Sequence, residues 1–468
     1  MTTNSAHTTP KIILGPLIGS MTSTSAKLWA RTSGEATLYA WIASKPDLSD
    51  IKLYGKTSLL TAETGFVGTV HITGLQPETT YWYQLTLQDI PPTDPEQANH
   101  FTTFPLEDSP TPFTFAFGSC IRLESPEADM FKVLGDLTQS EELAFNLLIG
   151  DQVYADISEF NGIGKIAESL SDYRELYLLS WQRKYLQKSL ANLPVFMTSD
   201  DHEVEDDWRW ADEDLTKPVI PKFNILKRWL TGKKPRHISI ERLKNALQAY
   251  FEHQVIHSPN NFPINQPFNL KTFTPTYYSF DYGQASFFVM DTRTRRTRSF
   301  WHWKQRNMLG EDQWEALIKW LTENNSANKP KFIVTSSGFL TRHWVDIFND
   351  RWRGFGKERN RLLNLLADMR AENVVLLSGD LHSSSIVSGK LDNTIPIWEF
   401  CCSPIENKPE RITKYTFSNW PLRRVRNIKR HHYAAENCWG IVQVTYDESG
   451  MPNISYDIRG NHGSSLIV

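Results

Sequence analysis

Three polar motifs in this 468-residue chain each follow a short apolar run, and each carries side chains that can bind metal ions. The first is Gly150-Asp151-Gln152-Val153-Tyr154-Ala155-Asp156. An aspartate such as Asp151 can bridge two cations with its two oxygens. The phenol of Tyr154, with an ordinary pKa of about 10, becomes a phenolate near neutral pH only beside a strongly polarising ion such as Fe³⁺. The alternative is an acidic loop with a packed tyrosine, because charged clusters are often structural.

The second motif, Asp200-Asp201-His202-Glu203, follows the apolar run 195–198. Nine of the fifteen residues from 200 to 214 are acidic. Packed negative charge repels itself unless a cation relieves it, so Asp201 and His202 are candidate functional residues at the end of this run. For residues 205–214 we favour the simpler interpretation of a solvated acidic loop.

The third motif, Gly379-Asp380-Leu381-His382-Ser383-Ser384, ends the apolar run 374–378. Asp380 and His382 are two positions apart, so in an extended segment both side chains point to the same side. A carboxylate beside an imidazole suits a metal pair. Because Asp-x-His is common by chance, its weight comes from its being the third motif of the series.

Two further residues stand at the ends of apolar runs. Cys120 follows 115–119 and is either a thiolate ligand or a buried apolar filler. Arg293, in Met290-Asp291-Thr292-Arg293, can clamp a phosphate through two parallel hydrogen bonds or form a surface ion pair with Asp291. Ligands of open α/β sheets bind just beyond the strand ends, so these positions would converge on one cleft.

Two kinds of element must position these residues. Residues 11–104 alternate apolar and polar side chains in short runs separated by turns, which predicts an all-β sandwich of about seven strands. Short apolar runs then alternate with helical patterns from residue 113, the signature of an α/β fold. We therefore expect a disordered N-terminus at 1–10, a fibronectin III-like domain at 11–104, a proline-containing linker at 105–112 and a catalytic domain at 113–468.

Composition excludes several classes of protein. The 50 basic and 53 acidic side chains nearly balance, which argues against a general nucleic-acid-coating role. No stretch reaches the roughly 18 consecutive apolar residues that a membrane span needs. Four cysteines do not make a disulfide framework, and no signal peptide or twin-arginine pair is seen. We expect a cytoplasmic protein, or a periplasmic one if a signal was removed. The oligomeric state cannot be read from the sequence.

Taken together, the motifs at 118–120, 150–156, 200–203, 290–293 and 379–384 resemble the PhoD-like (alkaline phosphatase D) branch of the calcineurin-like metallophosphatase superfamily. The resemblance implies two β-sheets flanked by helices, with a dinuclear metal centre, after an all-β domain. It also implies the following ligands: Cys120, Asp151, Tyr154 and His382 on Fe³⁺, and Asp151, Asp201 and Asp380 on a second ion. That ion is expected to be Ca²⁺, with Mn²⁺, Mg²⁺ and Zn²⁺ as alternatives.

The resemblance further implies catalytic roles for two residues, with His202 near the leaving oxygen and Arg293 near the phosphoryl group. The chain departs from the wider superfamily, which has Asn-His where this chain has Asp201-His202 and His-x-His where it has Asp380-Leu381-His382. The histidine usual in the motif before this one is missing from Thr335-Ser336-Ser337-Gly338. Whether His343 replaces it is open.

These features predict a metal-dependent hydrolase acting on small phosphate esters, either monoesters or diesters. Two cations about 3.5–4 Å apart would clamp the phosphoryl oxygens and supply a hydroxide for in-line attack. One alternative is a purple acid phosphatase-like enzyme with iron and zinc. Another is a catalytically idle binding protein. The segment 415–432, aromatic and basic, is either a lid over the cleft or an ordinary surface helix.

Overall fold

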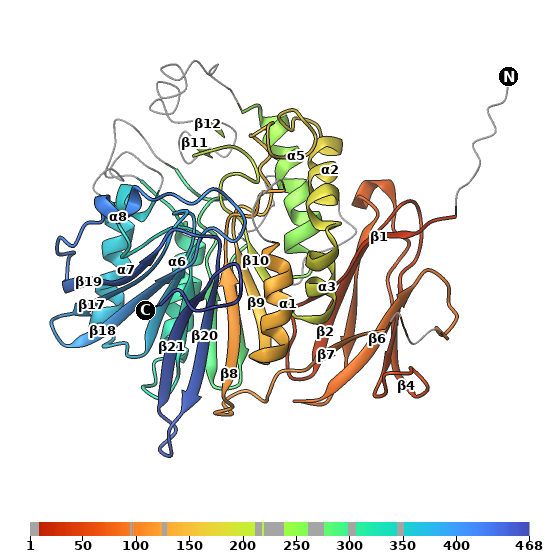
Figure 1. The fold of residues 1–468 in the computed structure, drawn as a ribbon, viewed down its shortest axis with the longest axis horizontal. Helices are drawn as coiled ribbons and strands as arrows, with labels where there is room; N and C mark the ends of the chain where they lie inside the picture. The colour runs from red at the N-terminus through yellow and green to blue at the C-terminus, as the bar shows by residue number, and fades with distance from the viewer. Residues whose placement is uncertain are drawn as a thin grey trace.

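The structure is a computed structural model that describes residues 9–93, 96, 98–123, 129–210, 218–219, 238–260, 276–297, 306–343 and 351–467. The N-terminal strands lie at one end of the molecule and the C-terminal strands at the other (Figure 1). Of the N-terminus expected to be disordered, residues 1–8 lie outside the described residues.

Two large sheets form the centre of the molecule. The first has the strand order β21-β20-β8-β9-β10-β1-β2-β5 and the second the order β13-β14-β15-β16-β18-β17-β19. The strands of the first sheet are β1 (Ile12–Gly19), β2 (Ser25–Thr32), β5 (Val67–Thr73), β8 (Phe113–Gly118), β9 (Leu143–Ile149), β10 (Val195–Thr198), β20 (Trp439–Tyr446) and β21 (Pro452–Arg459). Those of the second are β13 (Tyr278–Tyr282), β14 (Ala285–Val289), β15 (Lys331–Val334), β16 (Val374–Ser378), β17 (Ser384–Leu391), β18 (Ile395–Cys401) and β19 (Val425–Ala434).

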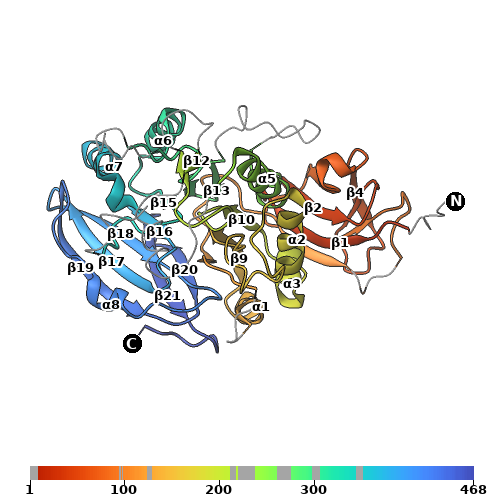
Figure 2. The same cartoon turned by 90° about the horizontal axis from the view of Figure 1, so that it is seen from above.

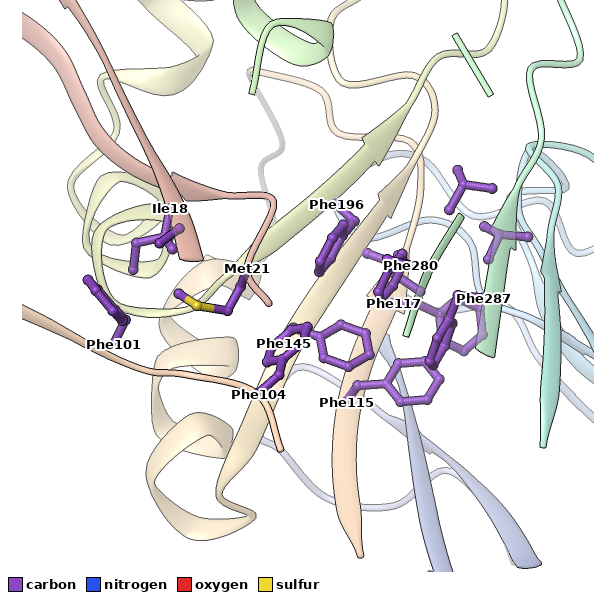
Figure 3. Close-up of a cluster of buried hydrophobic side chains, with 14 of the residues drawn as sticks. Ile18, Met21, Phe101, Phe104, Phe115, Phe117, Phe145, Phe196, Phe280 and Phe287 are labelled. Carbon is purple, nitrogen blue, oxygen red and sulfur yellow. The ribbon is translucent and has the colours of Figure 1, made fainter. Parts of the chain in front are cut away.

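Alternation along the strands explains why the two sheets pack face to face. Phe287 of β14 joins the core cluster that also holds Phe115 and Phe145 of the first sheet, whereas its neighbour Phe288 joins a cluster with the helices on the outer side. The close-up in Figure 3 shows the rings of Phe115, Phe145 and Phe287 gathered together. The parallel strands are therefore buried on both faces.

Helices cover the two outer faces, which completes four layers. Figure 2 shows α6 and α7 on one outer side and α1 and α3 on the other. The described helices are α1 (Met130–Ser140), α2 (Leu170–Trp181), α3 (Lys184–Asn192), α5 (Ile240–Tyr250), α6 (Glu311–Glu323), α7 (Gly356–Asp368) and α8 (Thr413–Thr416). A short β11–β12 pair (Arg209–Trp210 and Pro218–Val219) stands apart. The predicted α/β class is confirmed. None of the helices in the described part combines the length and apolar character needed to cross a membrane.

The N-terminal sandwich shares a sheet with the rest of the molecule. Strands β3 (Tyr39–Ala43), β4 (Ile51–Lys56), β6 (Thr80–Thr86) and β7 (Asn99–Thr102) form a four-stranded sheet that faces β1, β2 and β5. Strand β1 then pairs in parallel with β10, with Gly19 opposite Val195, so the first sheet runs across both parts. The exact domain boundaries drawn from the sequence stay a prediction.

One expected helix and one open alternative are wrong. The sequence pattern at 173–190 predicts a single helix, but the structure has two helices there, α2 and α3, because Arg183 takes an extended conformation (φ −62°, ψ 131°). The segment 415–432 is not a surface helix, because residues 425–434 form strand β19 and pair with β17. Strand β19 lies at the edge of its sheet, with Val425, Ile428 and Ala434 buried and the residues between them exposed or half-buried.

Candidate metal centre

The loops that follow β8, β9 and β16 bring the candidate ligands into strained backbone conformations. Cys120, Asp151, Asp380 and His382 have φ angles of 65°, 55°, 68° and 48°. A residue other than glycine in this left-handed region costs on the order of 1–3 kcal/mol and persists only where its surroundings hold it. Such strain occurs at functional sites, and four of the seventeen described non-glycine residues with a positive φ lie in these three loops.

The first ligand cluster contains Cys120, Asp151 and His382, whose ligand atoms all lie within 4.8 Å of one another. The Cys120 Sγ lies 3.4 Å from Asp151 Oδ2. The Tyr154 hydroxyl lies 3.4 Å from the same oxygen and 3.5 Å from His382 Nε2. A thiol, a phenol, an imidazole and a carboxyl from three loops therefore share one buried spot.

The second cluster contains Asp151, Asp201 and His202, again within 4.8 Å. Asp151 belongs to both clusters, so its carboxyl group is the one that they share. The ring of His202 is held by Asp156, whose Oδ1 lies 2.7 Å from His202 Nδ1. Because one ring nitrogen is occupied by this carboxylate, the other is the atom available for chemistry.

Asp380 stands outside both clusters among the described residues. Its Oδ2 accepts a hydrogen bond from Arg351 Nε at 2.6 Å, and its backbone N–H donates to Ser119 Oγ at 3.1 Å. The expectation that Asp380 and His382 lie on one extended segment is wrong, because both residues adopt a positive φ. His382 nevertheless reaches the first cluster.

Burial alone would keep these groups protonated. It raises the pKa of the Cys120 thiol to about 11, and it raises the pKa values of Asp151 and Tyr154 well above their ordinary range. Burial also lowers the pKa of His382, which favours the neutral imidazole that a metal needs. A bound cation would favour the thiolate, phenolate and carboxylate forms, so the donor set fits metal ions.

His202 has a different electrostatic setting. Burial opposes its charged form, but the neighbouring carboxylates of Asp156, Asp151 and Asp201 prevail and raise its pKa well above the ordinary value. The ring also packs against Tyr154, with the ring centroids 4.4 Å apart.

Arg293 is not on the surface. Its side chain is 1% exposed, with Nε 2.6 Å from Asp200 Oδ1 and Nη2 3.4 Å from Asp201 Oδ2. The alternative of a surface ion pair with Asp291 is therefore wrong. The Asp291 carboxylate instead accepts the backbone N–H groups of Arg293 and Thr294. Contact between Arg293 and a phosphoryl group stays a prediction.

The amino-acid sequence matches the models of a known protein family. Residues 115–453 match the model of the PhoD-like phosphatase family, and residues 2–105 match that of its N-terminal domain. The chain belongs to the PhoD-like phosphatase family. It is 26% identical over 361 residues to alkaline phosphatase D of Bacillus subtilis (strain 168). That match covers 69% of this chain and 54% of the relative, so the chain spans about half of the curated protein's length.

Solved structures show the same fold. A structure of PhoD superposes with a TM-score of 0.69 at 20% identity, covering 97% of this chain and 92% of the other. The purple acid phosphatase PPD1 from yellow lupin (Lupinus luteus) seeds gives a TM-score of 0.58 at 11% identity, covering 98% and 73%. The family match places the chain in the PhoD-like branch rather than among the purple acid phosphatases.

Sequence reasoning missed the groups that hold the PhoD-like site together. The buried Glu203 carboxylate accepts backbone N–H groups from Gln152 at 2.9 Å, Asp200 at 3.0 Å and Asp151 at 3.3 Å, so it joins two ligand loops. Burial raises its pKa to about 7. Ser403 donates to Cys120 Sγ and accepts from the His382 N–H. Glu203 was visible beside Asp201 and His202, but nothing in the sequence marks Ser403.

Two further expectations can be compared with the structure. Glu205 is not part of a solvated acidic loop, because it is fully buried and Arg242 Nη1 lies 2.8 Å from its Oε2. Residues 211–214 of that stretch lie outside the described residues. His343 is buried, with Nδ1 2.8 Å from Thr416 Oγ1, and is not part of either cluster in the described part of the chain.

Proposed function

We propose that this chain hydrolyses small phosphate esters at a two-metal centre bridged by Asp151. The observation that carries the proposal is that Asp151 belongs to two ligand clusters, one with Cys120 and His382 and one with Asp201 and His202. A carboxylate shared in this way is the arrangement that a dinuclear phosphatase site requires. Family membership and the strained backbone of the ligand loops support the same conclusion.

The first ion is proposed to be Fe³⁺, held by Cys120, Asp151, Tyr154 and His382. The second is proposed to be Ca²⁺, because an oxygen-only set suits a hard ion. It would be held by Asp151 and Asp201, and by Asp380 once that carboxylate leaves Arg351. Mn²⁺, Mg²⁺ and Zn²⁺ are alternatives at the second position. The ions, when bound, would stabilise negative charge on the phosphoryl oxygens and increase the acidity of a water molecule.

The remaining groups are proposed to position the ligands and move a proton. His202 protonates the leaving oxygen through Nε2, while Asp156 holds Nδ1 at 2.7 Å and so fixes the ring. Arg293 fixes Asp200 and Asp201, and its burial favours this positioning role over a long reach into the cleft. Whether it also contacts the phosphoryl group is tested by substrate affinity in Arg293→Lys, since lysine keeps the charge but loses the planar fork.

Elemental analysis of untagged protein, together with assays on a phosphomonoester and a phosphodiester, tests this proposal. We expect iron and calcium in about equal amounts and hydrolysis of at least one ester class. Iron with zinc would favour the purple acid phosphatase-like alternative. Protein that retains no metal and hydrolyses neither ester would contradict the proposal and favour an idle binding protein.

A further inference from the structure

A segment beside the candidate centre presents large hydrophobic side chains to solvent. We call residues 408–432, which include α8 and most of β19, the rim segment. Its side chains Ile412, Tyr415 and Trp420 are 66%, 80% and 75% exposed, more than any other large hydrophobic side chain in the described residues. Exposed hydrophobic groups clustered in nine residues indicate an interaction surface, since isolated exposed groups are ordinary but clusters are not.

The rim segment is also strongly basic. It has eight lysine or arginine residues and one acidic residue, although the whole chain has a net charge of −3. Lys408, Arg411, Lys414 and Arg423 are exposed and form no ion pair within the described residues. Arg424, by contrast, is used internally, since it pairs with Asp368 and Asp392. The exposed cations are therefore available to an anionic partner.

The inner side of the rim segment is fixed to the loops of the candidate centre. The Glu410 N–H donates to the His382 carbonyl at 2.7 Å, and Thr413 Oγ1 donates to Ser383 Oγ at 2.8 Å. The Ser418 N–H donates to the Arg342 carbonyl at 2.8 Å. Both cartoon views place α8 beside β19 (Figures 1 and 2). The exposed side chains therefore belong to a segment that hydrogen bonds hold beside the loop that carries His382.

We propose that the rim segment docks on an anionic lipid surface. Ile412, Tyr415 and Trp420 enter the interface, and exposed cations of the rim segment contact the lipid phosphates. Tyrosine and tryptophan favour the headgroup region of a bilayer, and lysine and arginine are attracted to its negative surface potential. The apolar and basic groups together supply the two contributions that reversible surface binding needs.

A nucleic acid is the less suitable partner for the same charges. Single-stranded nucleic acids are bound by aromatic side chains that stack on bases along a basic groove. Ile412 has no aromatic face, and at 66% exposed it gains from leaving water rather than from stacking. The mixture of an aliphatic and two amphipathic aromatic side chains therefore favours a lipid interface.

Vesicle sedimentation with the full chain tests the proposal. Phosphatidylcholine vesicles with about 30% phosphatidylglycerol are compared with phosphatidylcholine alone, at roughly 0.1 M salt. We expect at least about tenfold tighter binding to the anionic vesicles. The triple variant Ile412→Ser, Tyr415→Ser, Trp420→Ser is expected to bind about tenfold more weakly or worse. The variant Lys408→Gln, Arg411→Gln, Lys414→Gln is expected to lose the preference for anionic lipid.

A matched control replaces three exposed hydrophobic residues elsewhere, Leu59→Ser, Ile90→Ser and Leu106→Ser, which are 56%, 62% and 58% exposed. Its vesicle binding should equal that of the wild type. No binding by the wild type, or an equal loss in this control, would overturn the proposal, as would binding to a single-stranded oligonucleotide but not to vesicles. Hydrolysis of a soluble ester is measured in parallel and should not change, so failure of docking is distinguishable from failure of the proposed function.

Discussion

The middle of a strand and the loop that follows its end differ in the side chains that they bury and in what stabilises those side chains. Within β8 and β9, Phe115 and Phe145 stack with ring centroids 5.0 Å apart, fully buried and with no polar group to satisfy. A few residues further along each strand, Cys120 and Asp151 are just as buried, yet they carry ionisable groups on a left-handed backbone. The strand bodies are stabilised by packing, whereas the buried ionisable groups at the strand ends carry a desolvation cost that a bound cation would relieve. The packed strand bodies therefore account for stability, and the strand ends hold the residues proposed to carry the chemistry.

The largest expected effect is the loss of ester hydrolysis on substitution of Asp151, which follows the end of β9. Asp151→Asn removes the one carboxylate that both clusters share, so we expect the rate of ester hydrolysis to fall on the order of 10⁴-fold, or about 5.4 kcal/mol. The measurement is kcat on a phosphodiester together with metal content per chain. The thermal unfolding midpoint of the apo protein should stay within a few degrees of wild type.

Asp136→Asn is the matched control, because it removes a carboxylate on the exposed face of α1. It should leave both rate and metal content unchanged. Full activity in Asp151→Asn would show that the strand ends do not carry the chemistry.

The next effect is on a strand body. Phe287→Ala removes a ring that stacks on Phe332 and Phe280 at 4.7 Å and 4.6 Å, and the cavity should lower the free energy of unfolding by about 4 kcal/mol. Urea unfolding measures this loss, and Phe287→Leu should lose less. At a temperature where the variant is folded, kcat per folded molecule should match wild type. A large loss of kcat would break the separation between bodies and ends.

A smaller effect is expected at the proposed proton donor. His202→Asn should lower kcat about 10²-fold, or about 2.7 kcal/mol, on an ester with a poor leaving group. The loss should shrink on an ester whose leaving group needs no protonation, because only the former uses the proton of His202. An equal loss on both esters would indicate that His202 binds a metal or positions a ligand instead.

Glu203→Gln tests whether a group that touches no ligand atom still acts on the site. The amide keeps the shape but accepts fewer of the N–H groups of Gln152, Asp200 and Asp151, so metal affinity should fall about tenfold, or about 1.4 kcal/mol. Metal titration into the apo protein measures this change, and Glu372→Gln on the surface is the control. Unchanged affinity would mean that the ligand loops hold their positions without Glu203.

The smallest effect lies at the opposite end of β15, where burial lowers the pKa of Lys331 to about 8. The unfolded chain keeps its proton up to roughly pH 10.4, so above pH 8 it binds more protons than the native state and stability rises with pH. Between pH 8 and pH 9 the titration of Lys331 should contribute an increase of about 1 kcal/mol to the free energy of unfolding. Burial also lowers the pKa of Lys27 to about 8, so Lys331→Met should remove only the contribution of Lys331 to this slope and leave kcat unchanged. A slope equal to that of the wild type would assign it to other groups.

Much of the fold and of the candidate site could be predicted from the sequence, because strand bodies appear as apolar runs and strand ends as polar residues that follow them. The apolar runs predicted β8, β9, β10 and β16, and the polar residues after them predicted where Cys120, Asp151, Asp201 and His382 meet. What sequence could not predict depends on contacts between distant segments. The pairing of Arg293 with Asp200, of Arg351 with Asp380 and of β1 with β10 joins residues 29 to 176 positions apart.

The wrong expectations share a physical cause. The extended geometry assumed for Asp380 and His382 follows from a spacing rule that holds only for a regular strand, and the positive φ of both residues breaks it. Glu205 looked solvated because its neighbours are acidic, yet Arg242 from a distant helix neutralises it in the interior. Composition describes local preference, and tertiary contacts can override it.

The most direct test of the central claim is a crystal structure of the metal-replete protein with anomalous difference maps. The account predicts two peaks, one on each side of the Asp151 carboxylate and about 3.5–4 Å apart, with the first beside Cys120 and His382 and the second beside Asp201. The absence of any peak at Asp151, or a single ion that leaves one of its two clusters unfilled, would contradict a two-metal centre.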